Sequence, residues 1–194
     1  MYAYFRLGME KMASGDYAAC YQLLESALTL PQSLGSGIWN RCKYVPYRFY
    51  MAKCLEQLGR HDQAQQIYRE ILHIEVEFFS NMHLPELPYY QALCAEALDL
   101  PQKAWNIMAE VKRKWTKELT RIDNGFFTTT PFFISFAPEA SAMRRAYYSY
   151  LLGLVKLYEG EKEAAGKLFR ESHQLNSDHL FCHYYSQEIT VTRS

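Results

Sequence analysis

Two histidines near the C-terminus have the residue type and the spacing of a metal site. His179 and His183 stand four positions apart in a predicted helix. This spacing puts both imidazole rings on one helix face, and imidazole is a common zinc ligand. No acidic residue stands at helical spacing from the pair to complete a ligand set. We therefore expect no metal site and interpret both rings as partly exposed histidines of a terminal helix.

The other titratable residues form no arrangement that is typical of an enzyme. The sequence has neither an H-E-x-x-H nor a G-x-S-x-G motif, no phosphate-binding glycine loop and no EF-hand pattern. Glu159, Glu161 and Glu163 alternate along the chain as on a solvated face. His73 and His83 stand isolated beside apolar residues. We therefore predict a non-catalytic protein that uses no cofactor.

The charge balance argues against a nucleic-acid partner. The 194 residues include 21 Lys+Arg and 21 Asp+Glu, which gives a net charge of zero. Phosphate recognition instead requires a clustered excess of basic residues. One basic run extends from Lys112 to Lys117, but Glu110 and Glu118 flank it. We interpret this run as a solvated helix end, where cations suit the helix dipole.

Hydropathy and cysteine usage predict a cytoplasmic protein without a membrane span. No apolar stretch reaches the roughly 18 residues that a spanning helix needs. The first residues also lack the pattern of a secretory signal. The cysteines are odd in number and contain no C-x-x-C pair, which suits reduced and buried thiols. They are Cys20, Cys42, Cys54, Cys94 and Cys182.

Small residues recur along the chain with the same two gaps. Two antiparallel helices pack closely only where side chains are small, so Gly8 should face Cys20 and Gly153 should face Ala165. The middle residue of each set falls where the chain reverses, which favours the positive φ of glycine. In the third set we interpret Asp99 as a helix N-cap, with Pro101 in the first turn. The sets are Gly8, Gly15 and Cys20; Ala52, Gly59 and Ala64; Ala92, Asp99 and Ala104; and Gly153, Gly160 and Ala165.

These segments resemble a known repeat family. Tyr4-x-x-Leu7-Gly8, Gly15-Asp16-Tyr17 and Cys20-x-x-x-Leu24-x-x-Ala27 are similar to a tetratricopeptide repeat, as are Leu152-Gly153, Glu159-Gly160 and Ala164-Ala165. The resemblance implies an all-α fold, an α-α superhelix of about four irregular helical hairpins with a C-terminal capping helix. It also implies one domain over 1–194, with repeats at about 1–34, 45–78, 85–118 and 146–179 and a capping helix at about 179–190.

An insertion at about 117–139 separates the third and fourth predicted repeats. Asn124-Gly125 indicates a turn, and the segment Phe126 to Phe136 that follows is rich in phenylalanine and free of charge. Such a segment aggregates when exposed, so we expect it to be covered. It either packs on the protein's own helices, lies across the concave face, or docks on another domain or subunit. A homodimer is one way to provide that subunit.

The resemblance also implies a binding face. In tetratricopeptide folds the first helix of each pair lines a concave surface where protein segments bind, and the surplus aromatic residues of this chain gather there. In an alternative interpretation, most of these rings only pack between repeats. Adjacent rings cannot share one helix face, so one ring of each pair should be buried and the other should approach the groove. The pairs are Phe49-Tyr50, Tyr89-Tyr90 and Tyr147-Tyr148. The candidate groove residues are Tyr2, Phe5, Phe49, Tyr50, Lys53, Tyr89, Tyr90, Tyr147 and Tyr150.

Three functional hypotheses follow from the sequence. The first is an interaction or scaffold module that binds a protein segment or a neighbouring domain, in cis or in trans. Replacing Phe49, Tyr89 and Tyr150 with alanine should then abolish partner capture and leave helicity intact. The second is the C-terminal helical part of a larger bacterial carbohydrate-related protein, to whose tail the segment Phe127 to Phe136 bears a weak resemblance. The third is a tyrosine-rich cleft that binds a sugar or another small molecule.

Overall fold

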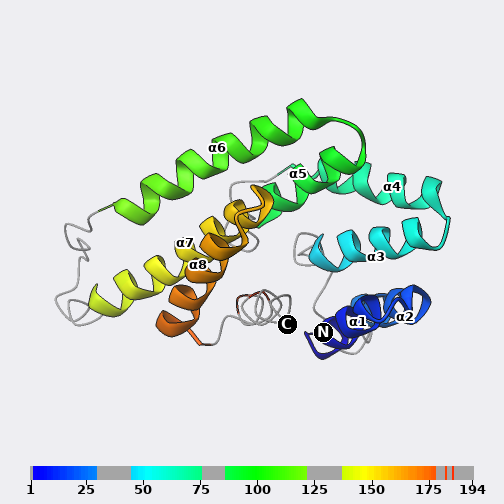
Figure 1. Ribbon diagram of the computed structural model, residues 1–194, viewed down its shortest axis with the longest axis horizontal. Coiled ribbons are helices and arrows are strands. Elements are labelled where there is room, and N and C mark those ends of the chain that lie inside the picture. The colour runs from blue at the N-terminus through cyan, green and yellow to red at the C-terminus, as the bar shows by residue number, and fades with distance from the viewer. Residues whose placement is uncertain are drawn as a thin grey trace. The chain divides into compact units, whose positions relative to one another are not determined.

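Every regular element in the described part of the chain is an α-helix, as the sequence predicts (Figure 1). The computed structural model describes residues 2–29, 45–75, 86–121 and 137–177, together with Cys182 and Tyr185. The helices are α1 (Tyr2–Ala13), α2 (Tyr17–Leu28), α3 (Val45–Gln57), α4 (His61–Leu72), α5 (Leu87–Ala97), α6 (Pro101–Thr120), α7 (Ala137–Tyr158) and α8 (Lys162–Leu175).

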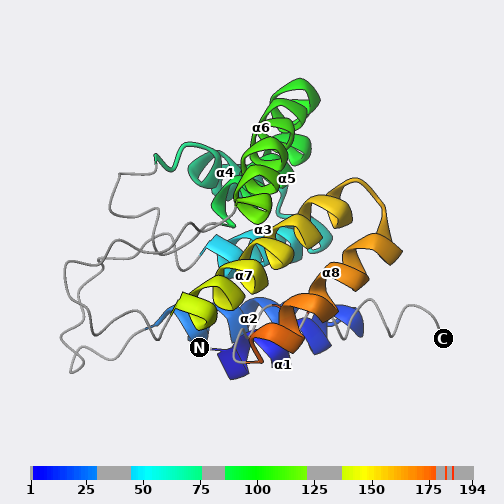
Figure 2. The ribbon, with the colours of Figure 1, turned by 90° about the vertical axis from the view of Figure 1, so that its left-hand side faces the viewer.

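The chain divides into two compact units, residues 1–108 and 109–194, and the boundary falls inside α6. In the first unit each of the helices α1 to α4 packs against the next one along the chain, and α3 also contacts α5 (Figure 1). In the second unit α7 and α8 lie side by side (Figure 2). Packing between successive helices is the arrangement of an α-helical solenoid.

The helix bounds refine the predicted repeat limits. The α1–α2 and α3–α4 hairpins fall within the predicted ranges 1–34 and 45–78. Helix α7, however, begins at Ala137, well before the predicted start at 146, and α6 continues to Thr120. Both helices therefore extend into the predicted insertion, whose residues 122–136 lie outside the described residues. Of the predicted capping helix, only Cys182 and Tyr185 are described, and both are helical and buried.

Four turns between helices share one backbone geometry. Gly15, Gly59 and Gly160 have φ of 79°, 74° and 77°, which confirms the expected left-handed conformation. In the first turn the N–H of Gly15 donates to Met12 O (3.0 Å) and the N–H of the next residue donates to Lys11 O (2.9 Å). This pair of bonds satisfies carbonyl groups that the helix end leaves without an intrahelical donor.

Asp99 adopts the same geometry, and its interpretation as an N-cap is therefore wrong. Its φ is 58°, its N–H donates to Glu96 O (3.0 Å), and the N–H of Leu100 donates to Ala95 O (2.8 Å). Leu100, not Asp99, directly precedes Pro101, the first residue of α6. Asp99 thus occupies the position that glycine holds in the other three turns. Aspartate tolerates this conformation better than most residues, but less well than glycine.

We expect the substitution Asp99→Gly to raise the free energy of unfolding by about 1 kcal/mol, because glycine adopts a positive φ without strain. Gly59→Ala should lower it by about 1–2 kcal/mol. A Cβ atom added at Gly59 meets nothing within 4 Å, so backbone strain alone sets this cost. Thermal and urea unfolding measure both changes. Asp99→Ala is the control, and an equal gain from Asp99→Ala and Asp99→Gly would contradict the backbone explanation.

A cluster of aromatic rings joins the helices of the first unit. The ring of Phe49 lies 5.9 Å from that of Tyr68 on α4 and 5.6 Å from that of Tyr90 on α5, measured between centroids. Phe5 on α1 lies 5.2 Å from Tyr47 on α3. Such tilted and edge-to-face pairs stabilise packing beyond the area that they bury. The cluster therefore ties α1, α3, α4 and α5 together around α3.

Two polar side chains close the exposed carbonyl ends of neighbouring helices. The amide Nε2 of Gln91 on α5 donates to Ile74 O (3.0 Å) and Ile71 O (3.3 Å) at the end of α4. The guanidinium of Arg144 on α7 donates to Arg121 O (2.6 Å) and Glu118 O (3.3 Å) at the end of α6. These four bonds supply donors to carbonyls at the helix ends, and they help to fix where the next helix lies.

Candidate partner-binding surface

Most of the predicted groove residues are buried. Phe5, Phe49, Tyr89, Tyr90 and Tyr150 are each at most 5% exposed, whereas Tyr50, Lys53 and Tyr147 are partly exposed. The side chain of Tyr2 lies outside the described part of the structure. In this structure the five buried rings form the core instead of lining an open groove. This packing role matches the alternative interpretation of the aromatic surplus.

The expectation for adjacent rings is confirmed for one pair and wrong for two. Phe49 is buried and Tyr50 is partly exposed, as expected. Tyr89 and Tyr90 are both buried, because α5 contacts both α3 and α4 and so has two covered sides. Burial also raises the pKa of Tyr89, and the neighbouring Tyr50 and Glu96 add to the shift. Tyr147 and its neighbour Tyr148 are both partly exposed.

Helix α3 presents a small polar surface above the ring cluster, which we call the α3 patch and define as Tyr50, Lys53 and Glu56. The Lys53 ammonium lies 6.0 Å from the ring centroid of Phe49 and 5.8 Å from that of Tyr68, within cation–π range. It also lies 3.1 Å from a carboxylate oxygen of Glu56. All three residues are partly exposed. The patch therefore offers a ring edge, a cation and a carboxylate on a rigid base.

An apolar pocket lies between α7 and α8 in the second unit. Its volume is about 400 Å³, which is within the range of ligand pockets. Met143 at its rim is 60% exposed, and the rings of Tyr147 and Tyr148 meet edge to face at 5.3 Å. The complete lining, which we call the α7–α8 pocket, is Met143, Arg144, Ala146, Tyr147, Tyr148, Ser172 and Asn176.

Sequence reasoning found one residue of this pocket, Tyr147, and missed the others. Met143 and Arg144 precede the predicted start of the fourth repeat at 146, because α7 begins earlier than the repeat pattern indicates. Ser172 lies on the second helix of the pair and Asn176 is the C-cap of that helix, which the resemblance does not assign to the concave face. Only the packing of α8 against α7 brings these residues together.

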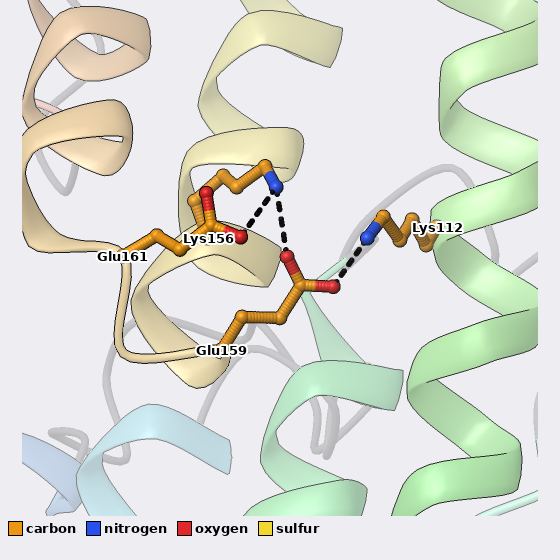
Figure 3. A network of polar contacts seen from close by, with 4 residues as sticks. All are labelled: Lys112, Lys156, Glu159 and Glu161. Atoms are coloured by element: carbon orange, nitrogen blue, oxygen red, sulfur yellow. Dashed lines mark hydrogen bonds and ion pairs between the residues drawn. The ribbon is translucent and has the colours of Figure 1, made fainter.

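Four charged residues in the second unit form a network of ion pairs on an exposed surface (Figure 3). Lys156 Nζ lies 2.9 Å from carboxylate oxygens of both Glu159 and Glu161, and Lys112 on α6 pairs with Glu159. Lys112 in the basic run and the Glu159 region are thus ion-paired as well as exposed to solvent. The pairing joins α6 to the turn between α7 and α8, across 47 positions of sequence.

Ion pairing in this network lowers the pKa of Glu159 and raises the pKa of Lys156. Partial burial raises the pKa of Glu159, but hydrogen bonds from Lys112 and Lys156 outweigh this effect, so its pKa is lowered. Hydrogen bonds to Glu159 and Glu161 raise the pKa of Lys156. A lowered carboxylate pKa means that the ionised form stabilises the fold above the unfolded-state pKa of about 4.3 and that this contribution is lost as the pH falls through the folded-state value.

Glu159→Gln should therefore lower the free energy of unfolding by about 0.5–1 kcal/mol at pH 7, because it removes the charge that both lysines share. The difference from the natural chain should shrink as the pH falls below about 4.3 and vanish only below the lowered folded-state pKa of Glu159, and about 1 M salt should reduce it. Urea unfolding across pH and salt measures this effect. The control is Glu110→Gln, at an exposed position of α6. Equal losses for both variants at pH 7 would show that the network contributes nothing specific.

Two other findings limit the chemistry of the described residues. Among residues 2–29, 45–75, 86–121 and 137–177, no group of three or more His, Cys, Asp or Glu side chains is placed to hold a metal ion. His179 and His183 lie outside these ranges. No helix in the described part of the chain is both long enough and apolar enough to cross a membrane.

Comparison with known proteins gives one match. The family model of the tetratricopeptide repeat matches residues 47–75, which cover nearly all of α3, the turn at Gly59 and the whole of α4. No curated protein and no solved structure matches the chain. The matched hairpin contains the α3 patch.

Proposed function

We propose, from the tetratricopeptide repeat that residues 47–75 form, that this chain is a non-catalytic interaction module that binds a segment of another protein. Tetratricopeptide repeats in general mediate protein–protein interaction. The observation that carries the proposal is the α3 patch, because it lies on the first helix of the matched repeat. It also contains two of the residues that the sequence predicts for the binding face, Tyr50 and Lys53.

The α3 patch has the properties of a recognition surface. Tyr50 packs against Phe49, with ring centroids 5.4 Å apart, so its ring is already ordered before a partner arrives. Lys53 is likewise held over two rings. A preordered ring and a preordered cation lose little conformational entropy on binding. We expect a partner segment to bind through apolar contact with Tyr50 and hydrogen bonds to Lys53 and Glu56.

The α7–α8 pocket supports a second contact point in the other unit. Met143, Tyr147 and Tyr148 offer apolar surface, while Ser172 and Asn176 offer polar groups at the pocket wall. Methionine adapts its shape to irregular partners, and tyrosine supplies a large contact area. We therefore expect this pocket by itself to accept an apolar side chain of a protein segment.

The test compares what three variants of the full chain capture from the native lysate. The patch variant carries Tyr50→Ala and Lys53→Ala, and the pocket variant carries Met143→Ala and Tyr147→Ala. The control is Trp105→Ala, which removes a ring that is 62% exposed on α6 and belongs to neither surface. Circular dichroism first checks that each variant keeps its helicity.

We expect the patch variant to lose partners that the natural chain and Trp105→Ala both retain. Direct titration with a fragment of such a partner should show at least a tenfold weaker Kd, which is about 1.4 kcal/mol. Retention of every partner by both the patch variant and the pocket variant would contradict the proposal.

The α7–α8 pocket also supports a second candidate function, the binding of a small polar molecule such as a sugar. Two tyrosine rings beside serine and asparagine side chains combine stacking surface with hydrogen-bonding groups. Isothermal calorimetry of the full chain against a glycan panel tests this candidate. Heat of binding that disappears in Tyr147→Ala would support it, and the absence of any heat would eliminate it.

A further inference from the structure

A polar pocket opens between α4 and the turn that precedes α6. Its volume is about 300 Å³, at the lower end of the range of ligand pockets. All of its lining residues belong to the first unit, and none of them belongs to the α3 patch. We call it the α4–α6 pocket, and its polar lining consists of Gln65, Arg69, His73, Asp99 and Lys103.

Two cations in this pocket have no carboxylate partner. The structure describes seven lysine and arginine side chains in the first unit. Four of them pair with a carboxylate, and the Cζ atom of Arg60 lies 5.8 Å from the ring centroid of Tyr21. The remaining two are Arg69 and Lys103, and neither forms an ion pair within the described ranges. Both of them line the α4–α6 pocket.

Hydrogen bonds along α4 orient two of the polar side chains. Gln65, Arg69 and His73 follow one another at intervals of four residues, so they share one face of the helix. Arg69 Nη2 donates to Gln65 Oε1 at 2.7 Å. His73 Nδ1 lies 2.7 Å from Arg69 O, and because a carbonyl oxygen only accepts, Nδ1 carries the proton. Nε2 is therefore the ring nitrogen that can contact a ligand.

The charges of the lining fit a ligand with one negative charge better than a ligand with two. Arg69 and Lys103 are positive and Asp99 is negative, so the lining has a net charge of +1 when His73 is neutral. A carboxylate balances this charge, whereas a phosphate monoester carries about −2 and leaves an excess. Arginine also binds a carboxylate through two parallel N–H···O bonds.

The rest of the lining is apolar. Leu72 is 7% exposed, Leu98 is partly exposed and Leu100 is 44% exposed. Apolar surface beside two cations suits a molecule that carries its carboxylate on a short carbon chain.

We propose that the α4–α6 pocket binds a carboxylate group on a short carbon chain, with Arg69 and Lys103 as the charged contacts. His73 Nε2 contacts a polar group next to the carboxylate, and the leucine side chains cover the carbon chain. The carboxylate belongs either to a free small acid or to the side chain of an acidic residue in a protein. This binding is independent of the α3 patch and of the α7–α8 pocket, because it uses no residue of either.

The experiment records amide NMR spectra of the full chain, labelled with nitrogen-15, during titration at neutral pH without added salt. The first probe is L-lactate, and its control is the neutral L-lactamide. The second probe is a blocked glycine–glutamate–glycine tripeptide, and its control has glutamine in place of glutamate. We expect saturable shifts at residues 69–73 and 98–103 with a charged probe and none with its neutral control. The charged probe that binds more tightly identifies the source of the carboxylate.

Variants then test the charged contacts. Lys103→Gln should weaken binding about three- to tenfold. It should not lower the unfolding temperature, because Lys103 stands in the first turn of α6, where the helix dipole disfavours a cation. The matched control is Lys162→Gln, because Lys162 is an exposed lysine in the first turn of α8 and lies outside the pocket. Asp99→Asn should tighten binding about two- to threefold, because it removes a like charge and asparagine also tolerates the turn conformation.

Three outcomes would overturn the proposal. The first is that neither charged probe gives saturable shifts at residues 69–73 and 98–103. The second is that a charged probe and its neutral control give equal shifts, because the carboxylate would then not be recognised. The third is that Lys103→Gln binds as tightly as the natural chain, or that Lys162→Gln weakens binding equally, because the attraction would then not be specific to this pocket.

Discussion

Replacing Phe49 with alanine should lower the free energy of unfolding by about 3–5 kcal/mol, the usual cost of removing a buried ring. Phe49 is 4% exposed and contacts the rings of Tyr50, Tyr68 and Tyr90, so the substitution leaves a cavity where α3, α4 and α5 meet. Urea unfolding followed by circular dichroism at 222 nm measures the loss.

The matched control for this substitution is Tyr50→Ala. Tyr50 is adjacent in sequence and partly exposed, so we expect it to cost about 1–2 kcal/mol less than Phe49→Ala. The structure thus changes the test that the sequence suggests, because alanine at Phe49, Tyr89 and Tyr150 should unfold the protein. If Phe49→Ala kept full stability and lost only its partners, the assignment of this ring to the core would be wrong.

Replacing Gly153 with alanine should lower the free energy of unfolding by about 1–3 kcal/mol, even though alanine favours helices by about 1 kcal/mol over glycine. An added Cβ would lie 2.5 Å from Cε1 and 2.7 Å from Cδ1 of Phe169. This ring cannot move aside easily, because it is fully buried, lies 5.9 Å from Tyr150 and stacks on Tyr185 at 5.5 Å. The helices α7 and α8 must therefore separate slightly. Thermal unfolding measures the effect.

Gly8→Ala is the control at the equivalent position of the first hairpin. Its added Cβ would lie 3.3 Å from Cδ2 of Leu24, the far end of a flexible side chain, so the helix propensity of alanine should keep stability nearly unchanged. The double variant with Gly153→Ala and Phe169→Leu should lose less stability than the sum of the losses in the two single variants. Equal effects at Gly8 and Gly153 would contradict the steric explanation.

The spacing of small residues was sufficient to predict the helical hairpins. Glycine at a turn leaves a local signal, because its backbone conformation depends on that residue and its neighbours. The predicted contact partner is confirmed for Gly8, whose added Cβ would lie 3.7 Å from Cys20 O, but not for Gly153. The three atoms nearest to a Cβ added at Gly153 all belong to Phe169, because this large side chain, one turn beyond Ala165 on α8, fills the space that the glycine leaves. Spacing along one helix does not determine which residue of the other helix lies opposite.

The binding surface was harder to predict than the fold, for a related reason. Helix α5 carries two adjacent aromatic residues, and the sequence does not say that both α3 and α4 cover this helix. Tyr89 and Tyr90 were consequently assigned to the groove and are buried. The α7–α8 pocket depends on residues from two helices, and the Lys112–Glu159 pair joins positions far apart in sequence. Neither leaves a periodic signal.

In the gene, a single-base change would give the turn at Asp99 the glycine that the other three turns have. Changing the middle base of an aspartate codon gives a glycine codon, so a point mutation converts this turn to the residue that its backbone favours. Selection for stability could favour this mutation, because it should raise the free energy of unfolding by about 1 kcal/mol. A Cβ added at Gly15, Gly59 or Gly160 touches nothing, so the reverse change at those turns disturbs no packing contact. The turn residues of the repeats can therefore change with only small effects on stability, while the packing between the helices is kept.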